Sequence, residues 1–306
     1  MTRRNKPRGR NVTGILLLDK PVGLTSNDAL QRVKSLFRAR KAGHTGSLDK
    51  AASGLLPVCF GEATKFSGFL LNADKHYRTV FQLGIQTSTG DAEGEVVFRG
   101  ALQNLTRTRI NAVLKHFKGT ILQVPPMYSA LKHKGQRLYK LAHQGLEVDR
   151  EPREITVHRI ELLDYRDEEL ELEILCSKGT YIRTLAEDIG KELGCGAHVK
   201  FLRRIGVGPY SDKNLLTIPQ LESIAETGLP DLDAELLGVD SVLQDMPAVH
   251  LVDPVAFYLC QGQPVMVPGA PTSGALRIYT EEGRFLGVGE VLDDGRVAPK
   301  RLVAPG

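Results

Sequence analysis

The stretch 40–66 constrains this chain more than any other part of its sequence. It sets one histidine, His44, and one carboxylate, Asp49, among glycines directly before an apolar run. The glycines lie on both sides of the carboxylate, at Gly43, Gly46 and Gly54. Glycine lets the backbone take positive φ values or come close to a ligand. A loop that holds a single acid beside such flexible backbone is a candidate site for chemistry.

The pattern by itself leaves structural roles open for both side chains. An aspartate in a glycine-rich loop usually forms a turn or caps a helix, and a lone histidine is more often part of a structural hydrogen bond. The glycines do not form a phosphate-binding loop, because Leu48 stands five positions after Gly43 and no Gly-Lys-Ser/Thr follows. The residues alone therefore do not decide between a structural and a catalytic Asp49.

The order of residues in this stretch closely resembles the active-site motif of the TruB family. The matching pieces are Gly-His-x-Gly-x-Leu-Asp at 43–49, Ala-x-Gly-x-Leu-Pro at 52–57 and Gly-Glu-Ala-Thr-Lys at 61–65. Members of that family are bacterial tRNA pseudouridine-55 synthases whose motif Asp is catalytic, so the resemblance implies this role for Asp49. Many members carry Pro after this Asp. Here Lys50 restores a backbone N–H and adds a cation.

A second informative stretch, Cys-Ser-Lys-Gly-Thr-Tyr-Ile-Arg at 176–183, runs into a predicted helix that ends at Gly194. Arg183 would stand near the start of this helix, where a cation opposes the helix dipole. We therefore expect a compensating group, such as a buried carboxylate. The resemblance supplies one, because Arg183 matches the family arginine that pairs with the catalytic Asp. Without the resemblance, an exposed surface arginine would be the more common interpretation.

The resemblance implies roles for five further residues. Tyr77 matches the tyrosine that packs on the target base, and Tyr181 and Leu202 match residues that line the uridine pocket. His44 matches a histidine that contacts the T-loop, and Lys20 matches a lysine beside the pocket. Their ordinary alternatives are a half-buried strand tyrosine for Tyr77 and a core residue for Leu202.

Charge is distributed unevenly along the chain. The formal net charge is +4, yet residues 1–41 hold eleven Lys and Arg against two acids. This asymmetry suggests a polyanionic partner, although a solvated basic tail is the alternative. Residues 1–10 contain five arginines or lysines and no acid, and we expect them to be disordered within reach of RNA phosphates.

The sequence also predicts the setting in which the protein works. No run of eighteen apolar residues occurs and the N-terminus lacks the apolar core of a signal peptide, so we expect no membrane span. The sequence has four cysteines and no Cys-x-x-Cys pair; they lie at Cys59, Cys176, Cys195 and Cys260. This argues against a zinc site or a disulfide framework and fits a reducing cytoplasm.

Periodicity predicts a mixture of helices and strands. Strands are expected at 14–23, 74–84, 153–163, 169–177 and 198–206, the last with basic outer positions, and helices at 26–37, 106–117 and 182–193. Five acids without Lys or Arg at 229–245 indicate a connecting segment, and short strands with glycine turns after it suggest a small β-barrel.

Together with the resemblance, these patterns predict an α+β fold. We expect a pseudouridine-synthase-like catalytic domain on a mixed, mostly antiparallel sheet at 11–246, followed by a PUA-like, RNA-binding β-barrel at 247–306.

The chemistry that the resemblance implies is an isomerisation. It breaks the bond from ribose C1′ to N1 of uridine and makes one from C1′ to C5, so it needs no cofactor and no metal. The base must be flipped out of its stack, and the expected partner of a monomeric protein is the T-arm stem-loop of tRNA. Whether Asp49 attacks C1′, attacks the base or removes a ribose proton stays open. Two rivals remain: a glycosidase-like hydrolase, which usually pairs two carboxylates, and a non-catalytic RNA-binding protein.

Overall fold

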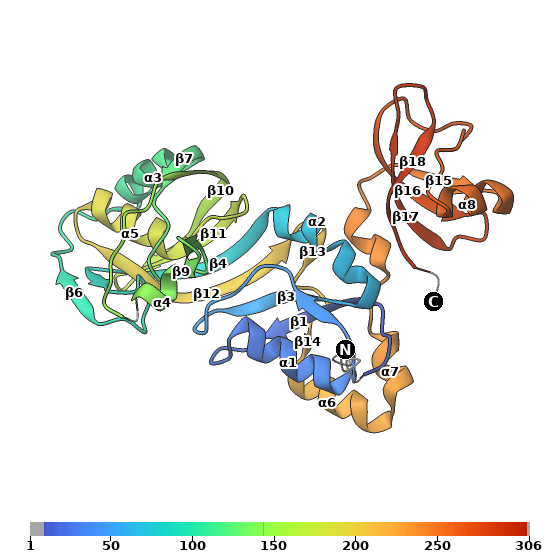
Figure 1. Cartoon of the computed structure of the whole chain (residues 1–306). Helices are drawn as coiled ribbons and strands as arrows, with labels where there is room; N and C mark the ends of the chain where they lie inside the picture. The colour runs from blue at the N-terminus through green and yellow to red at the C-terminus, as the bar shows by residue number, and fades with distance from the viewer. Residues whose placement is uncertain (1–8, 143, 305–306) are drawn as a thin grey trace.

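The computed structural model describes residues 9–142 and 144–304 (Figure 1). The basic tail predicted at 1–10 thus lies outside the described residues, apart from Gly9 and Arg10. Within the described part of the chain, no helix is long and apolar enough to cross a membrane.

A ten-stranded sheet forms the centre of the larger part of the molecule. Its main path runs through β14 (Leu216–Thr217), β1 (Gly14–Lys20), β3 (Ser53–Phe60), β12 (Ala197–Val207), β4 (Lys75–Leu83), β11 (Glu169–Cys176), β10 (Arg153–Arg166) and β7 (Gly119–Gln123). Beside it lie β2 (Ala42–His44), paired with β3, and β13 (Tyr210–Ser211), paired with β12. The pairs β1–β14 and β3–β12 are parallel and the others antiparallel. The expected mixed, mostly antiparallel sheet is confirmed.

Helices cover the sheet in two groups, which Figure 1 shows on separate flanks. The first group packs on β4, β10 and β11 and consists of α3 (Arg107–His116) and α5 (Ile182–Leu193). The second packs on β1 and β3 and consists of α1 (Ser26–Leu36), α6 (Ile218–Thr227) and α7 (Leu229–Ala234). The motif around Asp49 lies where these two groups meet, because β3 and β12 are neighbours in the sheet.

Shorter elements complete this part of the chain. They are the 3₁₀ helices η1 (Gly61–Lys65) and η2 (Val239–Leu243), the helices α2 (Ser67–Asn72) and α4 (Leu138–Ala142), and two hairpins made of β5 (Ile85–Thr87) with β6 (Val96–Arg99) and β8 (Lys132–His133) with β9 (Gln136–Arg137).

The C-terminal part is an open sheet in the described residues, where the sequence suggested a closed barrel. Its strands run in the order β15 (Ala248–Leu251), β16 (Gly274–Thr280), β17 (Phe285–Val291) and β18 (Val297–Leu302), with helix α8 (Asp253–Cys260) packed on them. Each strand pairs with its neighbour in the chain, and β15 and β18 stay at opposite edges. Figure 1 shows this sheet as a separate lobe in orange and red.

The acidic segment 229–245 is folded, although the sequence suggested a connecting stretch. It forms α7 and η2, and it buries Leu232 and Val242 in the two apolar cores around β1 and β3. Arg10 forms an ion pair with Asp233, with Nη2 at 2.6 Å from Oδ1. One acid of this segment is thus paired with a basic residue from the N-terminal end of the chain.

One apolar core joins the two parts of the molecule. Phe285 and Val288 of the C-terminal sheet pack together with Ile15, Phe66 and Leu70 of the larger part. The ring centroids of Phe66 and Phe285 are 5.7 Å apart. The C-terminal sheet therefore covers apolar surface of the larger part.

Candidate active site

Asp49 lies in the loop between β2 and β3, and both ends of this loop depend on glycine. Gly54 has a φ of +102°, and a Cβ added there would lie 2.2 Å from the carbonyl oxygen of Arg204. Only glycine allows β3 to approach β12 so closely at this point. Gly46, on the other side of Asp49, has a φ of +88°.

The loop is fixed to the start of α1 through one buried hydroxyl. Ser26 Oγ accepts a hydrogen bond from Leu48 N at 2.7 Å and donates one to Leu48 O at 3.0 Å. The N-cap of α1 is Thr25, whose hydroxyl accepts the Asp28 N–H at 3.1 Å. Ser26 is thereby free to hold the residue next to Asp49.

Asp49 and Arg183 meet across the cleft. Arg183 Nε lies 2.9 Å from Asp49 Oδ2, and the arginine side chain is 6% exposed. Its Nη1 donates to Thr89 O at 3.1 Å and its Nη2 to Tyr128 O at 2.7 Å. Asp91 Oδ2 stands 3.9 Å from Nη1 on the same side as Thr89. Contacts with three separate segments of the chain thus fix the orientation of the guanidinium group.

Burial raises the pKa of Asp49 above its ordinary value. Arg183 and Lys20 oppose this rise, and the charge of Asp91 adds to it. The side chain remains 46% exposed, and its exposed part opens into the cleft that it lines. Because burial outweighs the two cations in setting the pKa, this carboxylate is more basic than an ordinary aspartate.

Six of the seven residues singled out in the sequence line one cleft of about 660 Å³: His44, Asp49, Tyr77, Tyr181, Arg183 and Leu202. Lys20 is the exception. It is fully buried, and its Nζ donates to the carbonyl oxygens of Pro21 and Leu24 at 2.8 and 2.7 Å. Burial lowers the pKa of Lys20 to about 8. Its charge interacts with Asp49, although Lys20 does not line the cleft.

Tyr77 forms part of the cleft wall from β4. It is 9% exposed and lies directly opposite Arg204 of β12 in the sheet register. Burial raises the pKa of its hydroxyl to about 12, so the group is neutral near pH 7. The hydroxyl of Tyr77 is buried, and the residue lines the cleft.

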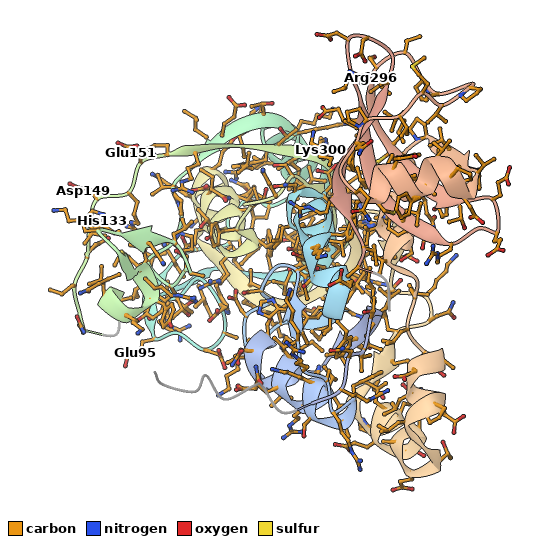
Figure 2. The ribbon with its side chains drawn as sticks, turned by 45° about the vertical axis from the view of Figure 1, so that its right-hand side comes forward. Glu95, His133, Asp149, Glu151, Arg296 and Lys300 are labelled. Atoms are coloured by element: carbon orange, nitrogen blue, oxygen red, sulfur yellow. The ribbon has the colours of Figure 1, made fainter. Side chains whose placement is uncertain are left out.

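The cleft is strongly cationic. Its lining holds one carboxylate, Asp49, and six basic side chains, Lys50, Lys75, Arg137, Lys178, Arg183 and Arg204. A second hollow of about 760 Å³ shares His44 with it and adds Lys132 and Lys140 from the segment around the β8–β9 hairpin. Figure 2 shows His133 of this hairpin at the left edge of the molecule and Arg296 of the C-terminal part at the upper right.

The sequence did not single out several charged residues of the site, among them Lys75, Asp91 and Arg204. Arg204 was assigned to a basic outer face of the strand 198–206, yet it is 1% exposed. The outward residue of the pair is Arg203, whose Nη2 bonds Asp19 at 2.8 Å. The period of two along β12 puts Leu202 and Arg204 on the same face, and this alternation was the available signal.

Three family models match the chain in succession. Residues 34–182 match the TruB family pseudouridylate synthase (N terminal domain). Residues 183–244 match the tRNA pseudouridylate synthase B C-terminal domain, and residues 247–303 match pseudouridine synthase II TruB, C-terminal.

Relatives match over nearly the whole length. A tRNA pseudouridine synthase B of Nitrosococcus oceani is 54% identical over 303 residues, which cover 99% of this chain and 98% of that protein. One of Ectopseudomonas mendocina is 56% identical over 298 residues, 97% of each chain.

Solved structures share the fold. A chain in the crystal structure of a Cbf5-Nop10-Gar1 complex has a TM-score of 0.74 at 24% identity and covers 100% of this chain and 92% of its own. A chain in an H/ACA RNP bound to a substrate RNA containing 2'-deoxyuridine gives 0.73 at 23% identity, with 99% and 92% covered. At these identities the likeness concerns the fold alone.

Proposed function

This chain belongs to the TruB family of pseudouridylate synthases, and we propose that it isomerises uridine 55 in the T-loop of tRNA to pseudouridine with Asp49 as its catalytic carboxylate. The observation that carries the proposal is the ion pair between Asp49 and the buried Arg183 in a cationic cleft. The names of its relatives, tRNA pseudouridine synthase B, support tRNA as the substrate.

The chemistry assigned to this pair is cleavage of the glycosidic bond. An ionised Asp49 faces the electron-poor C1′ as the bond to N1 breaks, and Arg183 holds the carboxylate in one orientation. Burial makes the carboxylate more basic, which strengthens it as a nucleophile or base. The reaction is an isomerisation, so the proposal includes neither a cofactor nor a metal.

The remaining cleft residues bind the flipped nucleotide in this proposal. Tyr77 packs on the target base, where a stacked aromatic ring contributes about 1–3 kcal/mol. Tyr181 and Leu202 line the uridine pocket. His44, which lines both the cleft and the second hollow beside it, contacts the T-loop. Lys20 acts on Asp49 through its charge.

The T-arm stem-loop is the proposed recognition element. The cationic cleft and the adjoining hollow with Lys132 and Lys140 suit a phosphate backbone on both sides of a flipped base. We assign the chemistry to residues 11–246 and additional RNA affinity to residues 247–306, in a monomer that works in the cytoplasm.

Two rival functions make different predictions. A glycosidase-like hydrolase usually pairs two carboxylates across its substrate, whereas Asp49 is the single carboxylate among the described residues that line this cleft. A non-catalytic RNA-binding protein has no need of an Asp–Arg pair.

One assay separates these functions. Purified protein is incubated with unmodified tRNA, and the RNA is digested and its nucleosides identified with their positions. Pseudouridine at position 55 is the expected product. Free uracil would indicate the hydrolase, and unchanged uridine would indicate the binding protein. A T-arm stem-loop should be modified at a useful rate, whereas an unstructured strand with the same loop sequence should not.

A further inference from the structure

Two buried cations line the cleft and are bonded to uncharged groups. Lys75 is 7% exposed and Arg204 is 1% exposed. The main-chain oxygens that accept from Lys75 Nζ are those of Leu70, Leu71 and Ala73, at 3.1, 2.8 and 2.6 Å. Those that accept from Arg204 are Leu55 O and Gly46 O, at 2.8 and 3.1 Å.

The two cations lie at one place in the cleft. A Cβ added to Gly46 would be 3.6 Å from Arg204 Nη1 and 3.9 Å from Lys75 Cε. Tyr77 is close to both cations. It lies two residues from Lys75 on β4 and directly opposite Arg204 on β12. The cations therefore flank the ring on which the target base is proposed to pack, next to the loop that carries Asp49.

Neighbouring acids are engaged with other groups. Asp49 pairs with Arg183, and Asp74, which precedes Lys75 in the chain, lies 3.2 Å from His158 Nε2. Burial and the charge of Arg204 lower the pKa of Lys75 to about 8, which still leaves most of the amine protonated near pH 7. A buried charge without a carboxylate partner is costly. Two such charges side by side indicate a function that needs positive potential.

We propose that Lys75 and Arg204 stabilise the negative charge that the uracil carries after its bond to C1′ has broken. This inference rests on the proposed pseudouridine synthase function. When the C1′–N1 bond breaks, its electron pair passes to the base, and the base becomes an anion spread over N1 and the ring carbonyl oxygens. The C1′–C5 bond then forms with electrons of the base, and the proton of C5 moves to N1, so the atoms of substrate and product are the same.

The arrangement favours the transition state over the bound substrate. Uracil attached to ribose is neutral and gains little from two cations, whereas the departing base gains a full negative charge. Fixed charges in a water-poor site stabilise such developing charge most effectively, because they do not need to reorganise during the reaction. The carbonyl oxygens that hold Lys75 and Arg204 fix their positions without neutralising their charge.

The test compares two substrates under single-turnover conditions with saturating enzyme. One T-arm stem-loop carries uridine at the target position and the other carries 5-fluorouridine, whose fluorine stabilises the base anion. Because C5 of 5-fluorouridine has no proton to lose, the rate compared on both substrates is that of breaking the C1′–N1 bond, measured as loss of the N1-linked nucleoside. The variants are Lys75→Gln and Arg204→Gln, which keep N–H donors for the carbonyl oxygens but remove the charge, together with Lys75→Arg, which keeps the charge. Lys115→Gln on the exposed face of α3 is the matched control.

We expect each Gln variant to lose at least about tenfold in rate on uridine, and clearly less on 5-fluorouridine. Lys75→Arg should retain most of the rate, and RNA affinity should change little. Rates are normalised to RNA-bound enzyme, so that partial unfolding of a variant does not enter the comparison.

Equal losses on the two substrates, or no loss in either Gln variant, would overturn the inference and leave structural roles for both cations. These outcomes require an active wild-type protein. If the wild type forms no pseudouridine at all, the proposed function itself has failed.

Discussion

Arg183 Nε lies 2.9 Å from Asp49 Oδ2, which joins the first turn of α5 to the loop before β3. A cation at the start of a helix opposes the helix dipole. The carboxylate of Asp49, with that of Asp91 at 3.9 Å, offsets this cost. The same contact directs Asp49 into the cleft, so one ion pair serves both the helix and the site.

The first prediction concerns the charge of Asp49. Asp49→Asn keeps the size of the side chain and removes the carboxylate, so turnover should fall to trace levels while tRNA binding stays nearly unchanged. Quantified pseudouridine per bound tRNA is the measurement. Pseudouridine above trace levels from this variant would remove Asp49 from the catalytic role.

The pH dependence of the rate should report the raised pKa of Asp49. In the proposed role the ionised form is required, and burial raises this pKa above its ordinary value. Acidification should therefore stop single turnovers at a higher pH than it would with an ordinary aspartate. Asp91 raises the pKa and Arg183 lowers it. The acid limb should therefore move to lower pH in Asp91→Asn. It should move to higher pH in Arg183→Lys, which keeps the charge but loses the hydrogen bond from Nε to the carboxylate. Shifts in the opposite directions would contradict this assignment.

Arg183 should act through Asp49 and make no contact with RNA phosphate. Arg183→Lys keeps the charge but loses the planar fork that bonds Asp49, Thr89 and Tyr128. We expect the single-turnover rate to fall about 100-fold, as for a misplaced catalytic group. The salt dependence of tRNA binding should be unchanged. A salt slope reduced by about 0.7–0.9 with an unchanged rate would instead identify a phosphate contact.

The core shared by the two parts of the molecule should contribute to global stability. Phe66 is fully buried against Phe285, so Phe66→Ala should lower the free energy of unfolding by about 3–5 kcal/mol. Phe257→Ala on the exposed face of α8 is the control and should change it little. Deleting 247–306 uncovers the same core and should lower the melting temperature. A truncated protein that melts like the full chain would show that the shared core adds no stability.

The C-terminal sheet should contribute few phosphate contacts, because its cations are mostly engaged. Lys300 lies 2.8 Å from Glu290 and Arg296 lies 2.7 Å from Asp294. Arg284 is exposed, so Arg284→Gln should lower the salt slope of tRNA binding by up to about 0.7–0.9. Lys300→Gln should lower it less. Equal effects would mean that the ion pair with Glu290 opens when RNA binds.

Local patterns predicted the elements that position the site. The alternation of polar and apolar residues at 74–84 predicted the strand β4, and the apolar stripe after 182 predicted α5 with its end at Gly194. These predictions succeed because periodicity and capping act between residues close together in the chain. The motif around Asp49 likewise lies within one short stretch, and so the family was recognisable from the sequence.

Long-range pairing decided the rest. Alternation along β12 puts Arg203 and Arg204 on opposite faces, but the pairing of β12 with β4 decides that the face of Arg204 lines the cleft and that Arg203 contacts Asp19. The acidic segment 229–245 looked like a linker because its basic partner, Arg10, lies at the other end of the chain. The sequence of the C-terminal strands could not distinguish a closed barrel from an open sheet, since closure depends on whether the edge strands pair.

The sequence by itself determined the family, the loop that carries Asp49 and the main helices and strands around it, because each is written in neighbouring residues. The tertiary structure alone decided which cations stand around Asp49 and what the C-terminal sheet covers. Both depend on contacts between residues that are distant in the chain, and the free energy of such contacts comes from burial and ion pairing in the folded state.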